Sequence, residues 1–228
     1  MNVTLIGTMH NDLKGRERLE KLLNHLTPDV LTLEGSDEME EANKDVKSEL
    51  AQVLVEKGIT EINDIETFIE VTGISGYEWD VCKAYSKDNN MPLYKVECPG
   101  AEEFVKDSAA DALYQMRAMS AEEVQQRLIK FKNFKKSRFR RHFVDMVAYN
   151  EFLLKGRNKL MDKYLIGERD EHMYEEIKEI AENKHPGKHI VHVGGAQHTV
   201  QKPSLDRFTL GSQFPDADVY LLSYADLL

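Results

Sequence analysis

The chain alternates short apolar runs with longer stretches in which apolar residues recur every three or four positions. The short runs predict strands at residues 3–6, 29–33, 91–96, 190–193 and 219–223. Residues 18–26 carry leucines at helical spacing between the first two runs. A strand, a helix and a second strand within about thirty residues predict a parallel βαβ unit.

Two long helical regions interrupt this strand pattern. The spacing predicts helical insertions at about residues 37–90 and 101–184, and a Pro-Gly pair at 186–187 ends the second. The 228 residues fit one domain, 1–228, and no flexible linker divides them. We therefore expect an α/β fold with a mostly parallel central sheet of about four to six strands. The larger insertion is expected to cover the carboxyl edge of that sheet.

The charge balance is acidic. Lysine and arginine number 30 against 40 acidic residues, which gives a formal net charge of −10. This charge argues against general binding to nucleic acid or to an anionic membrane. One local exception is residues 130–141, where basic residues alternate with phenylalanines. We interpret this segment as a solvated helix face, with an anion-binding or nucleic-acid-binding patch as the alternative.

The cysteine count and the N-terminus favour a cytoplasmic setting. Only Cys82 and Cys98 are present, so we expect no disulfide in a reducing compartment. Met1 leads directly into a predicted strand, and no signal peptide precedes it. No apolar run approaches the ~20 residues that a membrane-spanning helix needs.

Residues that could carry chemistry follow four of the predicted strands. His10 and His198 each end a glycine-x-x-histidine motif, after the first and the fourth strand. Glu34 ends the second strand, and Glu97 and Cys98 end the third. The carboxyl ends of parallel strands share one edge, where ligands bind, so these side chains are expected to form one site. Two imidazoles with nearby carboxylates suit either a divalent metal with open positions or metal-free acid/base catalysis.

Two helical residues are expected to point into the same site. Arg169 extends an apolar stripe that contains Met173 and Ile177, so it should be buried and paired with a carboxylate. Glu78 lies on the helix face that carries the apolar residues of 81–85. Glu78 and Arg169 are therefore expected either to pair with each other or to line the cavity.

The order of these motifs resembles the TraB/PrgY/Tiki superfamily. Its members share two glycine-x-x-histidine motifs, a proline-aspartate strand that ends in glutamate, a central glutamate motif and a glutamate-arginine-aspartate motif. The corresponding segments here are LIGTMH at 5–10, PDVLTLE at 28–34, GYE at 76–78, GERD at 167–170 and VGGAQH at 193–198. Two features differ from the family: Glu97-Cys98 replaces a common aspartate-arginine pair, and the membrane-spanning segments of several relatives are missing.

The resemblance implies an αβ fold with one pocket and hydrolase-like chemistry. The Tiki branch resembles metal-dependent proteases that use manganese or cobalt. The erythromycin-esterase-like branch resembles a hydrolase in which histidine acts as the base. The PrgY and TraB branch is linked to peptide-pheromone shutdown, and a ChaN-like relative binds haem.

The residues and the resemblance together lead to one leading hypothesis. It is a soluble, metal-dependent hydrolase that acts on peptides or a related small substrate. His10 and His198 would bind Mn, Co or Zn together with Glu34, or with Glu78 in its place. The remaining carboxylate would act as a general base, and Arg169 would hold the oxyanion or a substrate carboxylate. The alternatives are a metal-free esterase with a histidine base, and a protein that sequesters a peptide, nucleotide or haem without turnover.

Overall fold

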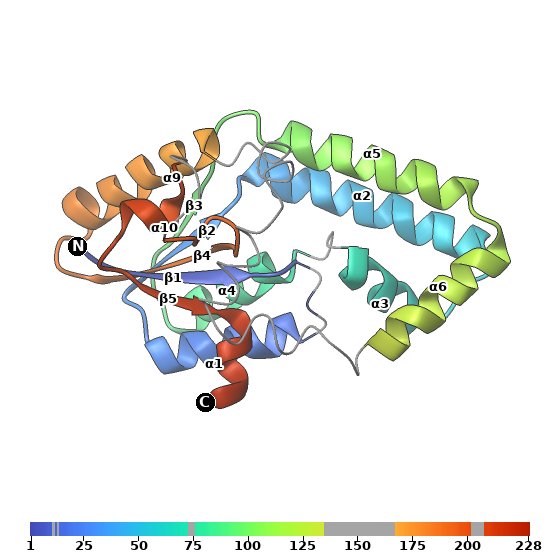
Figure 1. The fold of residues 1–228 in the computed structure, drawn as a ribbon, viewed down its shortest axis with the longest axis horizontal. Coiled ribbons are helices and arrows are strands. Elements are labelled where there is room, and N and C mark those ends of the chain that lie inside the picture. Colours follow the sequence, from blue (N-terminus) through green and yellow to red (C-terminus); the bar gives the residue numbers. More distant parts are fainter. Residues whose placement is uncertain (11, 13, 73–75, 135–166, 202–207) are drawn as a thin grey trace.

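Five parallel strands form the centre of the computed structural model, which describes residues 1–10, 12, 14–72, 76–134, 167–201 and 208–228 (Figure 1). The strand order is β3-β2-β4-β1-β5. The strands are β1 (Asn2–Thr8), β2 (Val30–Glu34), β3 (Leu93–Val96), β4 (His189–Gly195) and β5 (Asp218–Leu221). The predicted α/β fold with a parallel sheet is confirmed.

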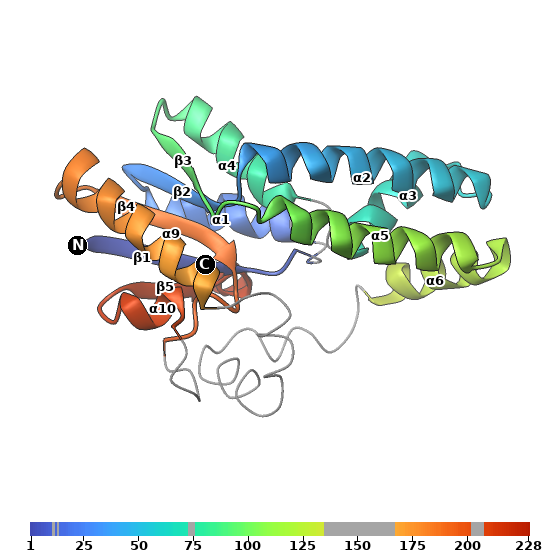
Figure 2. The same cartoon turned by 90° about the horizontal axis from the view of Figure 1, so that it is seen from above.

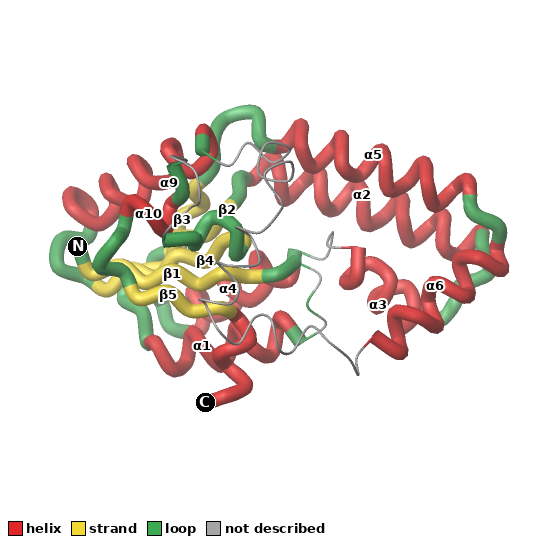
Figure 3. Tube along the Cα trace, in the orientation of Figure 1, coloured by secondary structure: helices red, strands yellow, loops and turns green. Residues whose placement is uncertain are grey.

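Helices connect the strands and extend well beyond them (Figure 3). They are α1 (Gly15–Leu26), α2 (Asp37–Glu56), α3 (Ile62–Thr72), α4 (Tyr77–Asp88), α5 (Glu102–Ala118), α6 (Ala121–Phe134), α9 (Glu168–Glu179), the π-helix η2 (Ile180–Lys184), α10 (Leu210–Gln213) and the 3-10 helix η3 (Leu222–Leu227). The helical insertion is confirmed, although residues 135–166 of it lie outside the described residues. The last strand ends at Leu221, two residues earlier than predicted, because the chain then turns into η3 and packs on α1.

The strand register places the two glycine-x-x-histidine motifs side by side. Gly7 of β1 lies opposite Gly194 of β4, and Thr8 lies opposite Gly195. Thr8 Oγ1 also donates a hydrogen bond to the Gly194 carbonyl over 3.1 Å. Two motifs from opposite ends of the chain therefore leave neighbouring strands at the same edge.

Each face of the sheet is covered by its own helices. On one face, Leu31, Leu33 and Val193 pack with residues of α1 and α4. On the other face, Leu5 and Ile190 pack with residues of α9 and α10. The strands thus have apolar side chains on both faces, as buried parallel strands require. The site at the carboxyl edge receives residues from α4 on one side and from α9 on the other.

The helices α2, α3, α5 and α6 form an arm beyond the carboxyl ends of the strands (Figures 1 and 2). The arm has an apolar core of its own, which includes Leu50, Phe68, Leu113 and Val124. Its first helix begins directly after β2, where the Ser36 hydroxyl accepts a hydrogen bond from the Met39 backbone and caps the helix. In the described part of the chain, no helix is long and apolar enough to cross a membrane.

Candidate active site

The turn after β4 places His198 at the carboxyl edge. The Ala196 backbone N–H donates to the Thr8 carbonyl over 2.9 Å, which ties this turn to the end of β1. At Gly7 a Cβ would lie 2.9 Å from Thr199 Oγ1 and 3.0 Å from the Ala196 Cα, so only glycine permits this approach. His198 is fully buried beneath the turn.

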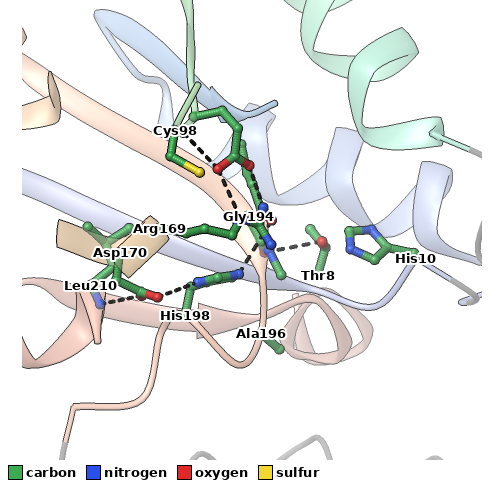
Figure 4. Close-up of polar contacts among 12 residues, drawn as sticks. Thr8, His10, Cys98, Arg169, Asp170, Gly194, Ala196, His198 and Leu210 are labelled. Carbon is green, nitrogen blue, oxygen red and sulfur yellow. Dashed lines mark hydrogen bonds and ion pairs between the residues drawn. The ribbon is translucent and has the colours of Figure 1, made fainter. Parts of the chain in front are cut away.

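Asp170 fixes the orientation of the His198 ring. His198 Nδ1 lies 2.9 Å from Asp170 Oδ2, and both side chains are fully buried (Figure 4). The same carboxylate accepts hydrogen bonds from the backbone N–H groups of Gly167 and Leu210, over 3.1 and 2.7 Å. Asp170 lies in the first turn of α9, where the helix dipole favours a negative charge. The carboxylate accepts this hydrogen bond, so Nδ1 carries a proton, and Nε2 is directed toward Glu34.

Arg169 joins the two carboxylates that end β2 and β3. Its guanidinium donates to Glu34 Oε1 over 2.6 Å and to Glu97 Oε1 over 3.0 Å, and it also bonds Glu97 Oε2. Arg169 and Glu97 are almost completely buried. Glu34 Oε2 accepts the Gly195 backbone N–H over 2.5 Å, so Glu34 also holds the turn after β4. The prediction that Arg169 is buried and paired is confirmed, and its partners are Glu34 and Glu97.

His10 and Glu78 form a second histidine–carboxylate pair. His10 Nδ1 lies 2.8 Å from Glu78 Oε1, and the His10 side chain is 50% exposed whereas that of Glu78 is 6% exposed. Glu78 lies in the first turn of α4, after Gly76, whose φ of 55° favours glycine. Tyr77 Oη donates to the Met9 carbonyl over 3.1 Å and so fixes the loop that carries His10.

Electrostatic interactions favour the charged forms of both histidines. Burial opposes protonation of His198, but the carboxylates of Asp170 and Glu34 outweigh it and raise its pKa to about 10. The surrounding protein also opposes protonation of His10, yet Glu78 raises the pKa of His10 to about 9. For Glu34, burial favours the neutral acid, but His198 and Arg169 hold its pKa well below the usual value.

The five expected site residues thus occupy two connected parts of one edge. His10 and Glu78 form a partly exposed pair, whereas Glu34, Arg169 and His198 form a buried network in which His198 Nε2 lies 3.4 Å from Glu34 Oε1. Figure 4 shows His198 on one side of the Gly194 turn and His10 beyond Thr8. The charges of Glu34 and His198 contribute to the pKa of His10, so the two parts interact electrostatically.

Two further residues of the network were not among the predicted catalytic residues. Asp170 follows Arg169 directly in the sequence. Its position in the first turn of a helix was the one feature that could have indicated a role in the network. Glu97 was recognised as the end of a strand, but its partner could not be identified without the position of α9. Cys98 is partly buried beside Glu97, and burial together with this carboxylate raises its pKa to about 11. Cys98 is therefore a thiol at neutral pH, which disfavours a nucleophilic role.

The expected metal ligands are bonded to other groups of the protein. Both oxygens of Glu34 are already bonded, one to Arg169 and the other to the Gly195 N–H. His10 is bonded to Glu78 and is half exposed, whereas His198 is fully buried. Among the residues described, no group of three or more His, Cys, Asp or Glu side chains is arranged to hold a metal ion. In this arrangement the carboxylate of the expected donor set, Glu34, is paired with the Arg169 guanidinium, and metal binding by His10, His198 and Glu34 stays a prediction.

Comparisons with known proteins add no family assignment. No family model matches the chain, and no curated protein and no solved structure matches it either. The likeness to the TraB/PrgY/Tiki superfamily therefore stays a prediction that depends on the motifs.

Proposed function

We propose that this protein is a hydrolase that cleaves a peptide or ester bond in a small substrate, with His10 as the general base. The observation that carries the proposal is the His10–Glu78 pair at the carboxyl edge of a parallel sheet, where ligand sites form. Its imidazole is half exposed and so within reach of a substrate. A carboxylate on Nδ1 orients the ring and stabilises the imidazolium that forms when a proton is taken up.

In this reaction the neutral form of His10, whose fraction rises as the pH approaches its pKa of about 9, removes a proton from a water molecule that attacks the substrate carbonyl. The tetrahedral intermediate then collapses, the C–N or C–O bond breaks, and His10 returns the proton to the leaving group. The buried network of Glu34, Arg169 and His198 has a supporting role, because it holds the turn after β4 beside the end of β1. General acid/base catalysis by such a group contributes about 10²–10⁴-fold to the rate.

The test is hydrolysis of a panel of fluorogenic peptides and p-nitrophenyl esters by the wild type and by matched variants. We expect His10→Gln to lower kcat/KM by about 10²–10⁴-fold, and Glu78→Gln to lower kcat/KM by a smaller factor. The control is His172→Gln, because His172 is also partly exposed and also faces a glutamate, Glu176 at 3.6 Å, but lies on α9 outside the His10–Glu78 pair. This control should retain full activity.

Two results would contradict the proposal. Activity that disappears on chelation and returns with manganese, cobalt or zinc would favour the metal-dependent hydrolase instead. Tight binding of one peptide, nucleotide or haem without turnover of any substrate would favour the sequestering protein.

A further inference from the structure

His192 lies directly beneath the candidate site. It is on β4, fully buried, and its Nδ1 lies 3.1 Å from the Thr32 hydroxyl oxygen on the neighbouring strand. His192 pairs with Thr32 in the strand register, and Glu34 and Gly194 follow two residues later on the same face of the sheet. The His192 side chain therefore belongs to the layer immediately below the Glu34 carboxylate.

The other ring nitrogen of His192 has no hydrogen-bond partner among the residues that the structure describes. In the described part of the chain only three buried side-chain polar atoms lack one, and two of them are Nε2 of His192 and Nε2 of His198. His198 Nε2 lies 3.4 Å from Glu34 Oε1, which is within ion-pair distance. A buried imidazole nitrogen without a partner costs free energy, so each such atom requires an explanation.

The hydrogen-bond partners determine which His192 nitrogen carries the proton. Burial lowers the pKa of His192 to about 4, so the ring is neutral and carries one N–H. Among the described contacts the Thr32 hydroxyl has His192 Nδ1 as its partner, and donating to Nδ1 satisfies the hydroxyl proton. The imidazole proton then lies on Nε2, where the nearby negative charge of Glu34 also favours a donor.

Gly194 shows how close Nε2 comes to that carboxylate. A Cβ built on Gly194 would lie 2.7 Å from His192 Nε2 and 3.0 Å from Glu34 Oε2. The two atoms are therefore close neighbours of one position above Gly194, yet they form no direct hydrogen bond with each other. A water molecule that bridges two such polar atoms is the usual way in which buried groups of this kind are satisfied.

We propose that His192 Nε2–H and the Glu34 carboxylate bind a buried water molecule above Gly194, and that His192 is through this water a positioning residue for Glu34. The water extends the polar network from Thr32, in the middle of the sheet, to Arg169 and His198 at its edge. Its existence is independent of the proposed hydrolase activity, whereas any effect of His192 on turnover rests on that activity.

The first test uses long-range ¹⁵N–¹H NMR spectra of the full chain and does not need activity. We expect His192 to show a neutral ring protonated at Nε2, with an Hε2 resonance that exchanges slowly with solvent. Gly194→Ala places a methyl group against both Nε2 and Glu34, and should remove the slow exchange. Gly195→Ala is the matched control, because its Cβ would lie 3.4 Å from Glu34 Oε2, an ordinary contact, and should leave the resonance unchanged.

Two further measurements keep the proposal testable if Gly194→Ala does not fold. Thr32→Val keeps the shape of the side chain but removes the hydroxyl that faces Nδ1, whereas Glu34 and the bridging water still favour a proton on Nε2, so the ring proton should stay on Nε2; its transfer to Nδ1 would contradict the proposal. A high-resolution crystal structure should show an ordered water within hydrogen-bond distance of His192 Nε2 and Glu34. A ring protonated at Nδ1 in the wild type, or direct contact between Nε2 and the carboxylate, would overturn the proposal.

Discussion

At the scale of single residues, Arg169 is the group on which the buried network depends most. It neutralises Glu34 and Glu97, whose carboxylates are almost inaccessible to water. Arg169→Met leaves the buried charge of Glu97 without a cationic partner and leaves Glu34 with His198 alone, so we expect it to lower the free energy of unfolding by about 3–5 kcal/mol. Urea denaturation at neutral pH measures this change.

The matched control for Arg169 is an exposed ion pair. Arg16 and Asp80 are 3.0 Å apart, and both side chains are about half exposed, so Arg16→Met should cost only about 0–1 kcal/mol. Adding Glu97→Gln to Arg169→Met should recover part of the lost stability, because the unpaired buried charge of Glu97 is removed. Equal effects of the two arginine substitutions would show that the network contributes little to folding.

His192 gives the protein a specific sensitivity to acid. Its pKa is about 4 in the folded protein because of burial, against about 6.5 in an unfolded chain. Between pH 6.5 and pH 4 the unfolded state therefore binds more protons than the folded state. The stabilisation that the neutral His192 contributes is fully present above about pH 6.5 and is lost as the pH falls toward 4. The loss amounts to on the order of 3 kcal/mol.

His192→Asn tests this acid sensitivity because it keeps a polar side chain that does not titrate. We expect its free energy of unfolding to fall less than that of the wild type between pH 7 and pH 5, measured by urea denaturation. The comparison with the wild type at each pH cancels the opposite contributions of His10 and His198, whose pKa values are raised. Parallel pH profiles for the two proteins would show that His192 is not buried in the neutral form.

At the scale of secondary-structure elements, Glu40 connects the helical arm to the sheet. It lies near the start of α2 and pairs with Lys83 of α4 and with Lys95 of β3, the latter at 2.6 Å. Lys44 completes the cluster at 2.9 Å. Burial would favour the neutral acid, but hydrogen bonds from these lysines hold the pKa of Glu40 below its usual value. The pairing therefore stabilises the fold above about pH 4.5 and is lost as the pH falls further.

Glu40→Gln should lower the free energy of unfolding by about 1–3 kcal/mol at neutral pH, because hydrogen bonds to charged groups are lost. The effect should shrink as the pH falls below about 4.5, because the Glu40 carboxylate of the unfolded wild type is then protonated whereas that of the folded protein is still charged. Glu49→Gln provides the control, since the Glu49–Arg117 pair is exposed on the arm. Chemical denaturation at pH 7 and pH 4 compares the two variants, and equal losses would mean that Glu40 does not connect the elements.

At the scale of the whole molecule, we expect the arm and the sheet to unfold in one transition. The arm has a separate apolar core, but α2 follows β2 directly and is held by Glu40 at its start. Trp79 is the only tryptophan, and its indole N–H donates to the Glu34 carbonyl at the end of β2, so its fluorescence reports on the sheet. Far-UV circular dichroism reports mainly on the helices. Coincident melting midpoints are expected, and two separate midpoints would make the arm an independent unit.

The sequence predicts the local features of this fold better than its long-range partners. Strand and helix patterns are local, so the positions of His10, Glu34 and His198 after strands could be predicted. The pairing of Arg169 with Glu34 and Glu97 could not be predicted, because it depends on which face of the sheet α9 covers. Strand order likewise depends on contacts between distant residues, which no local pattern encodes.

The position of β1 in the sheet has a consequence for the synthesis of this protein on the ribosome. β1 is the first strand to be translated, but both of its neighbours, β4 and β5, lie between His189 and Leu221. Until residues 189–221 leave the ribosome, β2 and β3 can pair with each other, but β1 has no partner. Both edges of β1, which is an apolar strand, then stay unpaired. The sheet therefore closes only after β4 and β5 have been translated, and binding of β1 by a chaperone until then would protect the nascent chain from aggregation.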